Sequence, residues 1–265
     1  MPTEESESNP NLPPVWIVDW FLCGWNTYRR NPGRLIFGSL LLTASSVLFA
    51  LLPGGSLVSA IVSPPLIVGY LFTCARLVRG QTAQPVHLFA GFTHFGRVWL
   101  TFFLWGLILG LGIFLAGIPY IFFDTNILVG IVAGIVLLGF PYLIWALKYN
   151  FAVLATLDRS LSPREAFRFS AKIAEGCRAD LFPATLIGFL LPLVCYLPGI
   201  REVGSSLFAL ALPAPNGRVL QVGPLPYIVN AFLILPLVSA SWSAAYVGLV
   251  SRWEAVGKLE SEAPS

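Results

Sequence analysis

Charged side chains are scarce in this chain of 265 residues. Lysine, arginine, aspartate and glutamate make up 11% of the sequence, against about 25% in ordinary soluble domains. Hydrophobic residues make up 56%. A chain of this composition suits lipid better than water as its solvent, so composition predicts an integral membrane protein.

The residues that catalysis or metal binding would need are also few. The two histidines, His87 and His94, are not spaced by the three or four positions of a metal-binding pair on a helix. The four cysteines form no C-x-x-C pair and predict no structural disulfide. The 13 acidic residues map to tails, loops or interfaces, which argues against a carboxylate-driven pump. We therefore predict no enzyme active site, no metal or other cofactor, and no nucleic-acid partner.

Long apolar runs are what the sequence has in abundance. Roughly 20 apolar residues cross a bilayer core, and six runs approach or exceed that length: 35–52, 56–75, 98–118, 127–157, 181–197 and 227–250. The predicted fold is all-α and polytopic, with one six-helix transmembrane domain over 15–253. The acidic opening, 1–14, differs from a cleavable signal peptide and is predicted to be a disordered tail, and 254–265 is predicted to be a cytoplasmic tail.

The basic residues fall mainly on one side of these spans. Thirteen of the 16 lie on the same side: before the first span, between the second and third spans, between the fourth and fifth spans, or after the sixth span. Arg201 and Arg218 alone occupy the opposite loops, and Lys148 lies inside a span. The positive-inside rule then predicts a protein of the cell (inner) membrane with both termini in the cytoplasm.

The segment 162–182 concentrates seven charged residues in 21 positions. Its apolar and small residues fall on one side of a helical wheel, and its charges fall on the other, which predicts an amphipathic helix. Ser162, Pro163 and Glu165 provide a helix start with a capping box. We expect this helix to lie flat at the inner interface with its apolar side in lipid. The candidate contacts with anionic lipid or a partner are Arg164, Arg168, Lys172 and Arg178.

Similar segments precede the first and third spans. In each, an aromatic or small-residue face is followed by an arginine and then an apolar run, which predicts three tandem units over about 15–80, 81–159 and 160–253. Each unit would combine an interfacial helix with a two-helix hairpin. The alternative is that multi-pass proteins in general place aromatic residues and arginine at the inner interface.

Three stretches also carry a resemblance to known families: GWNTYRRNPG at 24–33, LFAGF at 88–92 and LDRSLSPREAFRFSAKIAEGCRADLF at 157–182. They resemble bacterial families of small multi-pass membrane proteins that are known only as domains of unknown function. They are also similar to the membrane domain that some bacteria attach to a glycerophosphodiester phosphodiesterase. The resemblance covers most of 15–253 and implies a membrane architecture. It implies no active-site residue, because no catalytic phosphodiesterase domain is present.

Glycines and prolines inside the spans predict close packing or broken helices. Gly106 and Gly110, and Gly130 and Gly134, have the G-x-x-x-G spacing that lets helices approach. The spacing predicts packing of the third span on the fourth, with a dimer seam as the alternative. Five prolines lie inside predicted spans, where each leaves a backbone carbonyl without its helical partner. The prolines serve either as kinks for helix packing or to free carbonyls that bind an ion. They are Pro64, Pro65, Pro141, Pro192 and Pro236.

Lys148 is the one Lys, Arg, Asp or Glu residue inside a predicted span. If 127–157 is a single helix it is roughly 46 Å long, longer than the roughly 30 Å bilayer core. Lys148 then either extends to the inner headgroups or lines a polar cavity with Tyr149, Asn150 and Asn230. These observations favour a non-catalytic membrane scaffold or accessory protein that contacts anionic inner-leaflet lipid or a membrane-protein partner. The alternative is a channel or facilitator for a small or amphiphilic solute.

Overall fold

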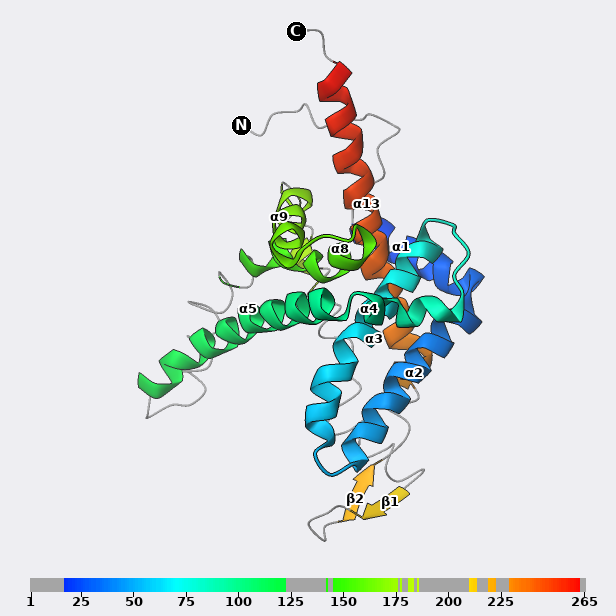
Figure 1. Ribbon diagram of the computed structural model, residues 1–265, viewed down its shortest axis with the longest axis vertical. Coiled ribbons are helices and arrows are strands. Elements are labelled where there is room, and N and C mark those ends of the chain that lie inside the picture. Colours follow the sequence, from blue (N-terminus) through cyan, green and yellow to red (C-terminus); the bar gives the residue numbers. More distant parts are fainter. Residues whose placement is uncertain are drawn as a thin grey trace.

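The computed structural model describes residues 17–122, 142, 145–175, 177, 181–183, 185, 210–213, 219–222 and 229–262. In this part of the chain the fold is helical apart from one short ribbon (Figure 1). The ribbon pairs β1 (Leu210–Pro213) with β2 (Val219–Val222) in antiparallel register, with Leu210 opposite Val222. It was not predicted, and it lies near the tip of the α2–α3 hairpin in Figure 1. The predicted tail over 1–14 lies outside the described residues.

Four of the described helices are long and apolar enough to cross a membrane. The qualifying stretches are Pro32–Phe49 in α2 (Pro32–Leu51), Gly55–Val78 in α3 (Gly55–Val78), Phe95–Gly112 in α5 (Phe95–Phe122) and Asn230–Ala255 at the end of the chain. They coincide with four of the six predicted runs, which indicates a helical membrane protein. The runs 127–157 and 181–197 lie largely outside the described residues, and six spans remain a prediction.

The helices gather around the last of them. A π-helical segment, η5 (Asn230–Ile234), leads into α13 (Leu235–Glu262), which continues through most of the predicted C-terminal tail. The first helix, α1 (Ile17–Arg30), packs along α13, and the α2–α3 hairpin packs beside it. Helix α5 projects away from this group and contacts it through its N-terminal part (Figure 1).

Short helices occur where interfacial segments were predicted. They are α1 before α2, η2 (Pro85–Phe89) with α4 (Ala90–Thr93) before α5, and α9 (Pro163–Ile173) after the fourth run. The α2–α3 pair is the only hairpin of the predicted kind whose two helices both lie in the described residues. The three tandem units therefore remain a prediction.

The fourth predicted span ends in a broken helix. The described part contains a 3-10 turn, η4 (Leu147–Tyr149), followed by α8 (Ala152–Asp158), so 127–157 does not meet the condition of a single continuous helix at this end. Ser170 of α9 occupies the break: its hydroxyl donates to the Lys148 carbonyl at 2.8 Å and accepts from the Phe151 amide at 3.2 Å. A side chain inserted into the backbone ladder is a recognised cause of such breaks.

The largest apolar core brings together elements from both ends of the chain. It includes Trp20 of α1, Phe151 and Leu154, Ile173 of α9, and Tyr246 of α13. A second core joins α2, α3 and η2 to α13 around Leu35 and Tyr70, whose hydroxyl donates to the Leu35 carbonyl at 3.0 Å. The first of these cores fixes α8 and α9, which carry the candidate site.

Candidate functional site

Helix α9 begins as the sequence predicts. Ser162 is extended, with φ of −68° and ψ of 157°, and Pro163 takes the first helical position. The Ser162 hydroxyl donates to Glu165 at 2.6 Å and its amide donates to the same carboxylate at 2.9 Å. These two hydrogen bonds, in that order, lower the pKa of Glu165, and the charges of Arg97 and Arg168 add to the effect. The helix ends at Ile173, so the predicted extension of one helix to residue 182 is wrong.

The apolar side of this segment is buried in protein. All six residues predicted to share that side are buried: Ala166, Ser170, Ile173, Ala174, Cys177 and Leu181. Four of them belong to the core built on Phe151, Leu154 and α13. The expectation that this side lies in lipid is therefore wrong, because α8 and α13 already cover it.

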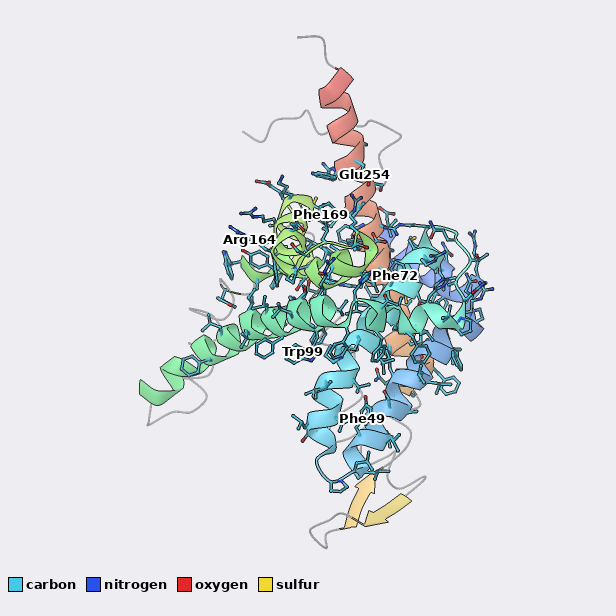
Figure 2. All side chains as sticks on the ribbon, in the orientation of Figure 1. Phe49, Phe72, Trp99, Arg164, Phe169 and Glu254 are labelled. Atoms are coloured by element: carbon cyan, nitrogen blue, oxygen red, sulfur yellow. The ribbon has the colours of Figure 1, made fainter. Side chains whose placement is uncertain are left out.

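The basic side of α9 faces outward. Arg164, Arg168 and Lys172 are exposed. Figure 2 shows Arg164 on the side of α9 away from α13, and Phe169 on the side toward it. Arg178, the fourth predicted contact, lies outside the described residues. The structure thus gives the predicted basic surface a fixed orientation.

The edge of α9 nearest α13 is held by Arg159. Its guanidinium pairs with Glu254 and lies 4.7 Å from the centre of the Phe169 ring and 5.9 Å from that of Trp253. Phe169 and Trp253 meet edge to face, with ring centres 5.4 Å apart. Aromatic rings and a guanidinium stacked in this way stabilise one another. The contact fixes α9 against α13 from the side opposite Arg164.

A second ionic contact lies at the ends of α3 and α8. Arg79 donates to both carboxylate oxygens of Asp158, at 2.6 and 2.7 Å, and the Tyr246 hydroxyl donates to Asp158 at 2.9 Å. Burial raises the pKa of Asp158, but the hydrogen bonds and charge of Arg79, together with Tyr246, outweigh it and lower the pKa overall. The sequence places Arg79 and Asp158 at predicted span ends but gives no signal that they pair.

The predicted polar site around Lys148 is only partly brought together. The Lys148 ammonium lies 4.6 Å from the centre of the Trp145 ring and 4.7 Å from that of Tyr149. Asn150 accepts from the Trp105 indole at 3.4 Å and donates to Thr185 at 3.3 Å. Asn230 lies in η5, which packs against α2, and its side-chain oxygen is buried without a partner in the described part of the chain. Lys148, Tyr149 and Asn150 are thus neighbours, and Asn230 belongs to another part of the fold.

Two of the carbonyls freed by proline are occupied by protein donors. Pro64 has no amide to offer the Ala60 carbonyl one turn earlier, and the Trp99 indole donates to it at 3.2 Å. Pro236 stands one turn after Phe232, whose carbonyl accepts from the Tyr28 hydroxyl at 2.8 Å. Both prolines therefore serve packing between helices, as one of the two predicted roles requires.

Comparison with known proteins gives no further guide. No family model, no curated protein and no solved structure matches this chain. The resemblance noted from the sequence stays a prediction.

Proposed function

We propose that this chain is a non-catalytic membrane scaffold or accessory protein whose α9 presents basic side chains to anionic lipid of the inner leaflet. The observation that supports this most is the division of α9 into two sides. Its apolar side is covered by the protein, and Arg164, Arg168 and Lys172 are left exposed. A basic surface next to a membrane attracts anionic headgroups, at ~1 kcal/mol for each nearby Lys or Arg.

The proposal includes the six-span arrangement with both termini in the cytoplasm. In that arrangement α9 lies on the cytoplasmic side, where the anionic lipids of the inner leaflet are found. Trp99 lies in the second turn of α5, at the start of the third predicted span, close to the interface where tryptophan concentrates in membrane proteins.

The alternative of a channel or facilitator has weaker support. It relied on polar residues and broken helices in the spans. The carbonyls at Ala60 and Phe232 already accept hydrogen bonds from protein donors, and Asn230 lies apart from Lys148.

The test is the lipid selectivity of the full chain reconstituted in vesicles. Spin-labelled phosphatidylglycerol should be enriched over spin-labelled phosphatidylcholine among the lipids immobilised at the protein surface. The enrichment should fall when the salt concentration is raised from 0.01 M to 1 M, because the screening length shortens from about 30 Å to about 3 Å. Equal immobilisation of the two lipids at low salt would contradict the proposal and direct attention to a protein partner for α9.

A further inference from the structure

A groove lies between α5 and the start of α9. Its volume is about 600 Å³, within the range of small-molecule binding sites. Leu100 and Leu104 of α5 form one wall, and Phe167 and Ala171 of α9 form another. Tyr149 also lines the groove and meets the Phe167 ring edge to face, with ring centres 5.5 Å apart. The interior is therefore apolar and aromatic.

Two arginines also line this groove. Arg164 and Arg168 are one helical turn apart and exposed, and neither forms an ion pair within the described part of the chain. By contrast, Arg79 and Arg159 are both paired with carboxylates. The nearest acidic neighbour in sequence, Glu165, is held by Ser162 at the helix start; the charge of Arg168 acts on it without an ion pair between the two.

Two unpaired guanidiniums one turn apart repel each other. Their planar donors match the oxygens of a phosphate, which would relieve the repulsion.

An apolar stripe leads out of the groove along α5. Leu100 and Leu104 are followed at helical spacing by Leu107 and Leu111, and all four side chains are exposed. Residues spaced by four, three and four positions lie on one side of a helix. The stripe runs from the basic groove into the apolar part of α5, in the direction that an acyl chain takes from its headgroup.

We propose that this groove binds one anionic phospholipid of the inner leaflet, with its phosphate at Arg164 and Arg168 and an acyl chain along the leucine stripe of α5. The inference rests on the proposed function, to which it adds a defined site and a stoichiometry of one. Charge complementarity selects an anionic headgroup, and the apolar interior selects a lipid over a soluble phosphate.

Native mass spectrometry of the full chain in mixed micelles tests the site. With equal phosphatidylglycerol and phosphatidylcholine, the wild type should retain one phosphatidylglycerol in preference. Arg164→Gln with Arg168→Gln should weaken that binding about 30-fold, from the attraction expected of two basic residues. The matched control is Arg30→Gln with Arg34→Gln, which removes two exposed charges at the same spacing from α1 and α2. The control should bind phosphatidylglycerol with an affinity within twofold of that of the wild type.

A second pair of variants tests the apolar part without changing charge. Ala171→Trp fills the groove and should reduce binding of both lipids at least tenfold, whereas Ala44→Trp, at an exposed site on α2, should not. Thermal unfolding of each variant checks that the fold is kept.

The outcomes separate the two proposals. A preference for phosphatidylglycerol that survives Ala171→Trp but is lost with Arg164→Gln and Arg168→Gln would overturn the groove and leave the proposed function standing, and so would an equal loss in the arginine control. A preference that survives both groove variants would overturn the groove and also the assignment of the lipid contact to α9. Displacement of the lipid by millimolar inorganic phosphate would overturn the lipid as the ligand in favour of a soluble anion. Equal retention of the two lipids by the wild type, together with equal immobilisation in vesicles, would overturn both proposals.

Discussion

Arg79 and Asp158, 79 positions apart in the sequence, join the ends of α3 and α8 through two parallel hydrogen bonds of 2.6 and 2.7 Å. The carboxylate side chain is 6% exposed and the guanidinium 25%, so the pair is largely shielded from water. Tyr246 adds a third helix to the contact. This junction sets the positions of α3, α8 and α13 relative to one another, and α8 in turn carries α9.

Asp158→Asn should destabilise the protein strongly, because it keeps the shape of the side chain but leaves Arg79 without its counter-charge. The expected loss in the free energy of unfolding is on the order of 3 kcal/mol, measured by denaturation in micelles. Tyr246→Phe removes one hydrogen bond from the same carboxylate and should lose about 1 kcal/mol. An equal effect of the two substitutions would show that the ion pair contributes little.

The same carboxylate should make stability depend on pH. The pKa of Asp158 is lowered in the folded state, so the unfolded state binds the proton more readily. The stabilisation is complete above the ordinary aspartate pKa of about 4 and is lost as the pH falls through the lower folded-state value. When the pH is lowered below about 4, the midpoint temperature of thermal unfolding of the wild type should therefore fall. In Asp158→Asn this part of the acid sensitivity should be missing.

Gly24→Ala should loosen the packing of α1 on α13. A methyl group at Gly24 would come within 2.6 Å of the Ser241 backbone nitrogen and 2.7 Å of its α-carbon, and backbone cannot move aside as a side chain does. We expect a loss of about 1–3 kcal/mol in unfolding free energy. Gly33→Ala in α2 is the matched control, because nothing lies within 4 Å of its added methyl. If both variants unfold at the same temperature as the wild type, Gly24 of α1 does not lie this close to Ser241 of α13.

Ala174→Leu tests what covers the apolar side of α9. Ala174 is fully buried in the core that includes Phe151 and Leu249, so a larger side chain should lower the free energy of unfolding by about 1–3 kcal/mol. If this side faced lipid, extra apolar bulk would be tolerated. Ala44→Leu, at an exposed position of α2, serves as the control that should be tolerated. Equal stability of the two variants would restore the lipid-facing orientation.

Reporter fusions test the six-span topology. Fusions after Pro53, after Asp124 and within 202–217 should report the outside, because the basic residues gather on the other side of the predicted spans. Fusions after Gly80, after Asp158 and at the C-terminus should report the cytoplasm. A cytoplasmic signal after Asp124 would remove the third or fourth span from the arrangement.

The features of α9 that the sequence predicts are those decided by neighbouring residues. The start at Ser162 and the choice of buried side follow from hydrogen bonds and periodicity within a few turns. What covers the buried side was not predictable, because periodicity identifies an apolar side but not the surface that it meets. The same limit applies to the break before α8, which depends on Ser170 from another helix.

Glycine spacing misses two close approaches for the same reason. Gly106 and Gly110 have the spacing of a packing motif, but Gly130 and Gly134 of their predicted partner span lie outside the described residues, so that packing stays a prediction. Gly69 and Gly91 have no such motif, yet a methyl group there would meet the Leu88 and Pro65 carbonyls at 2.0 Å. These approaches depend on how η2 and α4 return to α3, and that is a property of the tertiary fold.

The packing of α1 and α9 on α13 has a consequence for how the chain is assembled in the cell. Both helices leave the ribosome well before α13, yet Trp20 and Ile173 share a core with Tyr246 of that helix. Their apolar sides lack the cover that α13 provides until residues 235–262 have been synthesised and inserted. During translation the insertion machinery or the lipid interface has to shelter what α13 later covers. A ribosome that stalls before α13 would release a chain with both surfaces partly uncovered, a form suited to recognition by membrane proteases.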